Sequence, residues 1–110
     1  MRIHLIKKQS VEAWIVRHAQ SRAAFSGWLS VIKYADWKNP EDIVETFTRA
    51  DILGNGSNRI VFNIGGNRYR MICKYHFGKS TVHLYVKWIG THSEYSKLCN
   101  KRKQFSISNF

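Results

Sequence analysis

The sequence predicts an α+β domain: N-terminal helices packed on one face of an antiparallel β-sheet, a basic opposite face, and a short C-terminal helix. Three observations support this. Apolar residues recur at helical spacing in the first third of the chain, three later segments alternate between apolar and polar residues, and glycine-containing turns separate those segments. The 110 residues fit a single domain over residues 1–110.

The first third of the chain is predicted to be mainly helical. Residues 2–6 are short and partly alternating, as in an edge strand. Ser10 is placed to cap a helix that begins near Val11. Apolar residues then repeat at helical spacing: Val11, Trp14, Ile15, Phe25, Trp28, Leu29 and Ile32. The pattern over residues 10–35 fits either one helix or a helical hairpin that bends near residues 19–21. Asn39-Pro40 begins a further short helix, with a capping residue before a proline.

The second half is predicted to form strands over residues 59–64, 67–77 and 81–89. Residues 54–58 form a loop by composition. Gly65-Gly66 predicts a two-residue hairpin turn, which pairs Phe62 with Tyr69. The inward-facing set is then Ile60, Phe62, Ile64, Tyr69, Met71, Cys73, Tyr75, Phe77, Val82, Leu84, Val86 and Trp88.

Keeping these apolar residues together leaves a basic and aromatic set on the other face of the sheet. Its members are Arg68, Arg70, Lys74, His76, His83, Tyr85 and Lys87. No acid interrupts them, whereas an ordinary solvated face mixes both signs of charge. This clustering favours a phosphate-binding surface over an inert basic face.

The overall charge indicates a polyanionic partner. Eighteen Lys and Arg against seven Asp and Glu give a net charge of +11. Such an excess attracts nucleic acid or a ribosome, although an anionic membrane surface or an acidic protein shares the attraction.

Other classes of protein lack support in the sequence. No apolar run is long enough to span a membrane, and residues 1–6 are too short for a signal peptide. Cys73 and Cys99 lack the spacing of a metal site, so we expect two reduced thiols and no bound metal. Reduced thiols fit a cytoplasmic protein, and we expect no cofactor. Residues 100–110 form a polar, basic tail that is a candidate for disorder.

Two blocks carry a resemblance to a known family. Val61 to Arg70 is Val-Phe-Asn-Ile-Gly-Gly-Asn-Arg-Tyr-Arg, and Lys87 to Lys97 is Lys-Trp-Ile-Gly-Thr-His-Ser-Glu-Tyr-Ser-Lys. In order and spacing they resemble the hairpin and the ending of HigB toxins, within the RelE-like superfamily. The resemblance covers residues 2–98, and its specificity lies in residues 59–97. Lys87 replaces a common arginine and Ser96 a common aspartate, while residues 101–110 match no part of the pattern.

The resemblance implies an mRNA interferase, the endoribonuclease toxin of a type II toxin–antitoxin system. Such a toxin cuts mRNA on the ribosome during translation, where contacts with ribosomal RNA are expected. A HigA-like helix-turn-helix antitoxin would neutralise it, and operator DNA would be bound only through the toxin–antitoxin complex. No membrane is involved.

RNA cleavage without a metal gives roles to three residues. The 2′-OH attacks the adjacent phosphate, which requires proton transfers and stabilisation of an anionic transition state. His92 is the candidate for proton transfer, although it could serve only a Thr91–His92 helix cap. Arg70 is the candidate for stabilising phosphate charge. Tyr95, one helical turn after His92, could stack on a base, assist proton transfer, or close the helix onto the sheet.

The remaining candidates bind RNA without chemistry. Lys74 and Lys87 would hold neighbouring phosphates or remain solvated, while Asn67 and Arg68 serve the turn and general electrostatics. Glu94 faces solvent or caps the helix, and it is the only acid expected near the site. The histidines at positions 4, 18, 76 and 83 have no partner in the pattern.

Three other functions compete with the nuclease. A non-catalytic RNA- or ribosome-binding module would use the same basic face. A DNA-binding regulator lacks a recognition helix in this chain. A metal-dependent nuclease lacks a carboxylate cluster.

Overall fold

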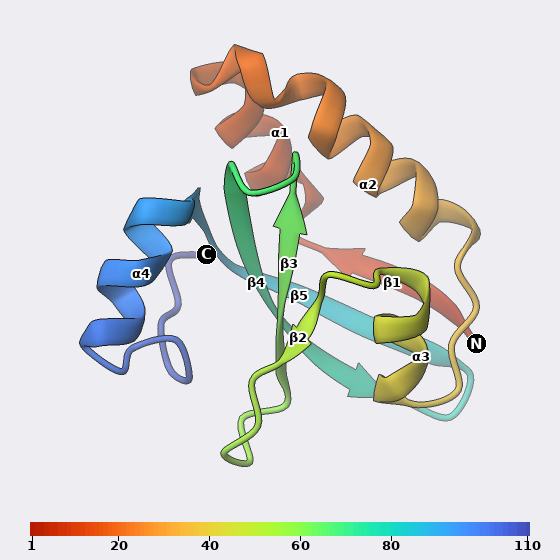
Figure 1. Ribbon diagram of the computed structural model, residues 1–110. Helices are drawn as coiled ribbons and strands as arrows, with labels where there is room; N and C mark the ends of the chain where they lie inside the picture. The colour runs from red at the N-terminus through yellow and green to blue at the C-terminus, as the bar shows by residue number, and fades with distance from the viewer.

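The computed structural model describes residues 1–110 and confirms the α+β class (Figure 1). Its five-stranded sheet has the order β1-β5-β4-β3-β2. The strands are β1 (Arg2–Ile6), β2 (Asp51–Ile52), β3 (Arg59–Ile64), β4 (Tyr69–Phe77) and β5 (Thr81–Thr91). The helices are α1 (Lys8–Arg17), α2 (Arg22–Tyr34), α3 (Pro40–Thr46) and α4 (His92–Asn100). The edge strand β1 runs parallel to β5, and all other neighbours are antiparallel.

Residues 8–34 form a helical hairpin, because the chain breaks at the 3₁₀ turn Ala19–Ser21 between α1 and α2. The predicted cap at Ser10 is wrong. The helix begins at Lys8, after Lys7 adopts a left-handed φ of 70°, and Ser10 lies inside the first turn. The predicted start of α3 is confirmed, since the Asn39 side chain accepts a hydrogen bond from the Asp42 amide and Pro40 follows it.

The hairpin between β3 and β4 differs from its predicted register. Ile64 pairs with Tyr69, so the loop is Gly65–Arg68 and contains four residues. Gly65 and Gly66 both have φ near +68°, a conformation that favours glycine. The pairing is displaced by two residues, and a displacement of two keeps every side chain on its predicted face.

A β-bulge in β5 overturns the prediction that Trp88 faces inward. Cys73 pairs with Val86 but the preceding Ile72 pairs with Trp88, so Lys87 is left without a partner on β4. The extra residue reverses the alternation beyond it. Trp88 therefore lies on the outer face, and Ile89 faces inward.

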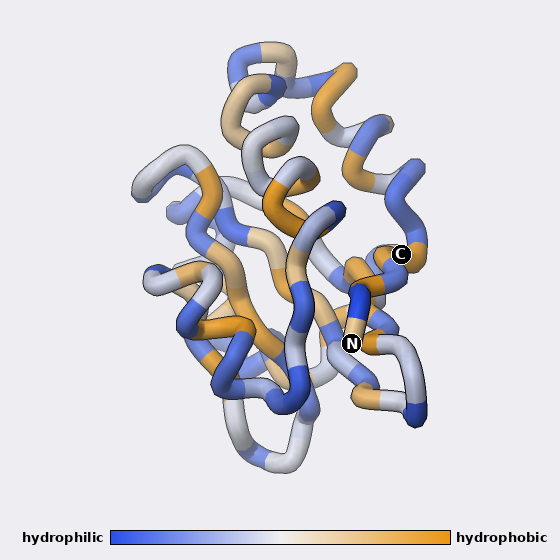
Figure 2. The backbone as a smooth tube through the Cα atoms, turned by 90° about the vertical axis from the view of Figure 1, so that its right-hand side faces the viewer, coloured by the Kyte–Doolittle hydropathy of each residue, from blue (hydrophilic) through white to orange (hydrophobic).

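The main core lies between the inner face of the sheet and helices α1, α2 and α3. It is a cluster of 19 buried residues that includes Phe25, Trp28 and Trp37. Hydrophobic and hydrophilic positions alternate along its helices and strands (Figure 2). This face of the sheet therefore supports the fold and leaves the opposite face for a site.

A second, smaller core covers one end of the outer face. Val61, Ile72 and Trp88 pack there against Leu98 of α4. Ile107 joins this cluster from the tail. The outer face is thus divided into a covered end and an open end, which the sequence pattern did not predict.

The tail from Lys101 onward is ordered against the sheet, in contrast to the expected disorder. The buried Arg59 guanidinium donates to the Gln104 carbonyl at 3.3 Å and to the Ile107 carbonyl at 2.7 Å. The Asn109 amide donates to the carbonyl of Lys87, the bulged residue that β4 leaves unpaired. These bonds satisfy groups that would otherwise lack a partner, and this explains the order of the tail.

Candidate active site

Arg70, His92 and Tyr95 meet in one hollow of about 370 Å³ between α4 and the strands β2, β3 and β4. The lining residues are Asp51, Val61, Asn63, Arg70, His92, Tyr95, Ser96, Cys99 and Asn100. The three predicted catalytic side chains are therefore neighbours in space, although they come from β4 and from α4.

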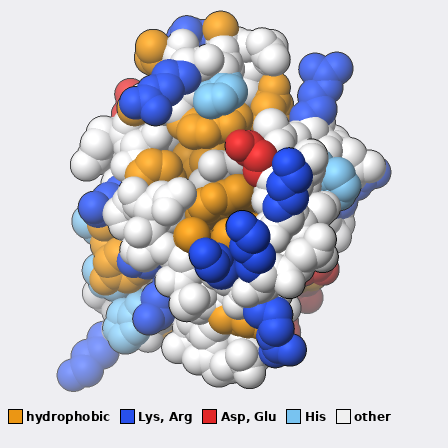
Figure 3. Space-filling model, turned by 90° about the vertical axis from the view of Figure 1, so that its left-hand side faces the viewer, with side chains coloured by type: hydrophobic (Ala, Val, Ile, Leu, Met, Phe, Trp, Pro, Cys, Tyr) orange, Lys and Arg blue, Asp and Glu red, His pale blue; other side chains and the backbone are white.

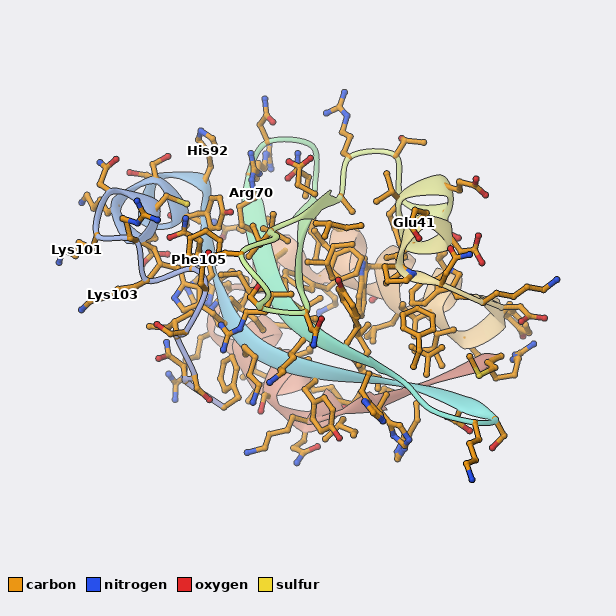
Figure 4. The ribbon with its side chains drawn as sticks, turned by 90° about the horizontal axis from the view of Figure 1, so that it is seen from below. Glu41, Arg70, His92, Lys101, Lys103 and Phe105 are labelled. Carbon is orange, nitrogen blue, oxygen red and sulfur yellow. The ribbon has the colours of Figure 1, made fainter.

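Arg70 and His92, both labelled in Figure 4, form a direct contact, and both line the hollow. The Arg70 Nη2 lies 2.8 Å from His92 Nδ1, and its Nη1 donates to the Tyr69 carbonyl at 3.1 Å. A guanidinium can only donate hydrogen bonds, so Nδ1 accepts and the neutral imidazole carries its proton on Nε2. His92 thus presents an N–H group to the outside.

The start of α4 fixes the position of His92. The Thr91 hydroxyl accepts from the Glu94 amide, and the Glu94 carboxylate accepts from the Thr91 amide at 2.8 Å. This capping box confirms the capping roles of Thr91 and Glu94. The His92 amide donates to the Arg68 carbonyl at 3.0 Å. The positive end of the α4 dipole therefore lies beside Arg70, an arrangement that favours an anion.

Tyr95 is half-buried and packs against Trp88, with ring centroids 6.0 Å apart. Burial, and then the neighbouring Cys99 thiol and Asp51 carboxylate, raise the pKa of the Tyr95 hydroxyl, which Arg70 opposes. The phenol is therefore neutral at ordinary pH. Of the roles open to Tyr95, closing the helix onto the sheet is the one the packing demonstrates.

The four predicted RNA-binding residues lie outside the hollow. Asn67 and Arg68 are exposed in the β3–β4 loop. Lys74 lies four residues farther along β4 than Arg70, and the rise per residue of a strand puts their Cα atoms about 13 Å apart. Lys87 is the bulged residue, and its ammonium lies 5.7 Å from the centre of the Tyr85 ring. The two lysines belong to the open end of the outer face.

Three histidines form a row across that open end. The ring centroids of His4 and His83, and those of His76 and His83, are each 5.9 Å apart. His18 instead stacks on Trp14, 3.7 Å between centroids. No group of three or more His, Cys, Asp or Glu side chains is arranged to hold a metal ion.

The sequence interpretation missed the polar lining of the hollow. Asp51, Asn63 and Asn100 contribute side chains to it, so Glu94 is not the only acid near the site. Asp51 begins a strand of two residues, which is too short to show alternation. Asn63 lies inside the Val61–Arg70 block and pairs with Arg70 on the outer face. Its place in that block was the one sequence signal that could have identified it as a site residue.

The surrounding surface is basic. Figure 3 shows Lys, Arg and His side chains around an apolar patch on the face that carries α4, with few acidic groups among them. Lys97, Lys101 and Lys103 border a second hollow there, between α4 and the tail. No helix is long and apolar enough to cross a bilayer.

Comparison with known proteins identifies the family. Residues 21–98 match the family model of HigB toxins, described as the RelE-like toxic component of a toxin–antitoxin system. The mRNA interferase HigB of Escherichia coli O6:H1 is 29% identical over 96 residues, covering 87% of this chain and 91% of that protein. The mRNA interferase toxin HigB of E. coli K12 is 25% identical over 93 residues, covering 84% and 88%. The chain therefore belongs to the HigB toxin family, the RelE-like toxic components of toxin–antitoxin systems.

Proposed function

We propose that this chain is a ribosome-dependent endoribonuclease that cuts translated mRNA by metal-independent attack of the 2′-OH on the adjacent phosphate. The observation that carries the proposal is the Arg70–His92 pair at the N-terminus of α4, within the hollow that also contains Tyr95. The relatives named above as mRNA interferases support the substrate class.

The pair suggests a sequence of events on substrate binding. A phosphate oxygen is a stronger, charge-assisted acceptor for Arg70 than the neutral Nδ1 of His92. Once Arg70 turns to the scissile phosphate, Nδ1 is free to take up a proton. The resulting imidazolium can donate its Nε2 proton to the departing O5′ while Arg70 stabilises the phosphorane charge. The products are a 2′,3′-cyclic phosphate and a 5′-OH.

The partners follow from the same proposal. Lys74 and Lys87, with Arg68 and Asn67 on the loop, would hold phosphates of the mRNA or of ribosomal RNA around the site. A HigA-like helix-turn-helix antitoxin would neutralise the toxin and connect it to operator DNA. The family supports an antitoxin partner, and the basic surface favours an acidic segment in it.

Expression of the chain alone tests this function. We expect growth arrest, with new 5′-OH ends inside the translated regions of mRNA. The same RNA should be cleaved only weakly when ribosomes are absent. Arg70→Ala at equal soluble expression should restore growth and remove the new ends. Intact transcripts under the wild-type toxin would refute cleavage, and if growth still stopped, a non-catalytic ribosome-binding module would replace it.

A further inference from the structure

Attack by the 2′-OH requires a group that removes its proton, and the three predicted residues do not supply one. The Arg70 guanidinium has no free lone pair, and the proposed mechanism uses His92 as the imidazolium that protonates O5′, a form that has no free lone pair either. Tyr95 is kept as a neutral phenol by its raised pKa. The proton acceptor must therefore be another residue of the hollow.

Asp51 is the only carboxylate that lines the hollow. Of the other lining groups, Asn63, Ser96 and Asn100 are not bases, and the Cys99 thiol neighbours the Tyr95 hydroxyl, whose pKa it helps to raise. A carboxylate is an established general base in proteins. By elimination, Asp51 is the lining group with the chemistry that the reaction needs.

Asp51 lines the hollow from β2, whereas His92 lines it from α4. Asp51 pairs with Val61 and so shares the outer face of the sheet with Arg70. Two strand spacings separate β2 from β4, about 10 Å between backbones. The hollow is thus lined by Asp51 from β2, Arg70 from β4 and His92 from α4. In-line displacement places the attacking and leaving oxygens on opposite sides of phosphorus, so the proton acceptor and the proton donor should come from different elements, as Asp51 and His92 do.

The Asp51 carboxylate has no partner within the protein. It makes no side-chain hydrogen bond, and the one ion pair of the chain joins the N-terminus to Asp36. An unpaired negative charge beside a phosphate site weakens phosphate binding. Asp51 is exposed, and without a protein partner its carboxylate oxygens are free to accept a proton from a bound substrate.

We propose that Asp51 is the proton acceptor for the 2′-OH, an assignment that rests on the proposed ribonuclease function. The Asp51 carboxylate takes the proton from the 2′-OH as the O2′–P bond forms. The P–O5′ bond breaks, and O5′ takes the Nε2 proton of the His92 imidazolium. Asp51 ends protonated and His92 neutral, and exchange of one proton with water restores both.

A sulfur-substituted substrate separates the two proton transfers. The substrate is an mRNA, programmed on ribosomes, that carries a bridging 5′-sulfur at the cleaved bond, because a thiolate leaves without protonation. His92→Ala should cut the ordinary RNA about 10²–10³-fold more slowly than wild type and recover on the 5′-thio RNA. Asp51→Asn should be slowed to a similar degree on both substrates, and Asp51→Glu should recover part of the rate.

The matched control is Glu41→Gln, which removes one negative charge from α3, apart from the Arg70–His92 pair (Figure 4). It should cleave at the wild-type rate. Wild-type cleavage by Asp51→Asn, or its recovery on the 5′-thio RNA, would overturn the assignment and leave the ribonuclease intact. Failure of the wild type to cleave, or cleavage of a 2′-deoxy substrate at the same bond, would instead refute the proposed function.

Discussion

Arg70 combines burial with a charge that the fold does not neutralise. The residue is 7% exposed, yet its guanidinium bonds only to a carbonyl and to a neutral imidazole. A buried cation usually has an acidic partner, because desolvation of the charge is costly. An incoming phosphate would supply that missing anion. At the scale of one residue, the unneutralised charge of Arg70 supports the proposal of an anionic substrate.

Removal of either member of the pair should abolish most of the activity. We expect Arg70→Ala and His92→Ala each to lower single-turnover cleavage on translating ribosomes by about 10²–10³-fold, since each removes a charge or proton-transfer group. His83→Ala, on the open end of the outer face, should cleave like wild type. Thermal melts of all three should be recorded beside the rates. Wild-type rates for both site variants would show that the site is wrong, even within this family.

Tyr95→Phe removes the hydroxyl and keeps the ring, so it separates the contribution of the hydroxyl from that of the ring. Because the raised pKa keeps the phenol protonated, with no phenolate to act as a base, and because the ring packs on Trp88, we expect cleavage within about tenfold of wild type. Tyr95→Ala should lower the melting temperature, since it removes an aromatic contact of the smaller core. A loss of about 10²-fold or more in Tyr95→Phe at unchanged melting would contradict the packing role and assign chemistry to the hydroxyl.

At the scale of elements, the bulge in β5 determines where the site can form. It turns Trp88 to the outer face, where the indole folds over Gly90, and Gly90 pairs with Arg70. A Cβ at Gly90 would lie 2.4 Å from the Trp88 ring. The absence of a side chain at this position therefore lets Trp88 pack beside the strand that carries Arg70.

Two glycine-to-alanine substitutions should change the free energy of unfolding in opposite directions. Gly90→Ala must displace the Trp88 ring, so we expect a loss of about 1–3 kcal/mol in the free energy of unfolding. Gly27→Ala, in the exposed middle of α2 with nothing within 4 Å of the added Cβ, should gain about 0.5–1 kcal/mol. Urea unfolding of both variants measures the difference. Equal stabilities would contradict the close packing of Trp88 on Gly90.

The capping box should affect both stability and catalysis. Thr91→Ala removes the acceptor for the Glu94 amide, at a cost of about 1 kcal/mol. Because His92 is the first residue of α4, a loosened helix start should also slow cleavage. Ser93→Ala, exposed in the same turn, is the control and should change neither. A Thr91→Ala variant that melts lower yet cleaves at the full rate would separate the cap from the site.

At the scale of the whole molecule, the charge excess is the dominant property. With +11 spread over 110 residues, association with an acidic antitoxin segment should be steered electrostatically. We expect the association rate to fall as salt rises from about 0.05 to 0.5 M, because the Debye length shrinks. Dissociation should change less. Stopped-flow association against salt measures this, and a flat profile would exclude steering.

Much of the fold follows from local rules that the sequence displays directly. The start of α3, the three alternating strands and the Thr91–Glu94 cap depend on residues within four positions of one another. The resemblance likewise brought Arg70, His92 and Tyr95 together, since its two blocks are adjacent in the fold. Alternation alone could not give the direction of β1, because a strand pattern does not encode its neighbour's direction.

The sequence by itself determined the α+β class, the basic residues at the open end of the outer face, the family blocks and the three side chains of the candidate site. Only the tertiary structure decided the loop register, the outward position of Trp88, the order of the tail and the presence of Asp51 in the hollow. The physical reason is the separation along the chain of the residues that interact. Caps and alternation are local, whereas the bulge is stabilised by the distant Asn109, and Asp51 reaches the site through pairing of β2 with β3.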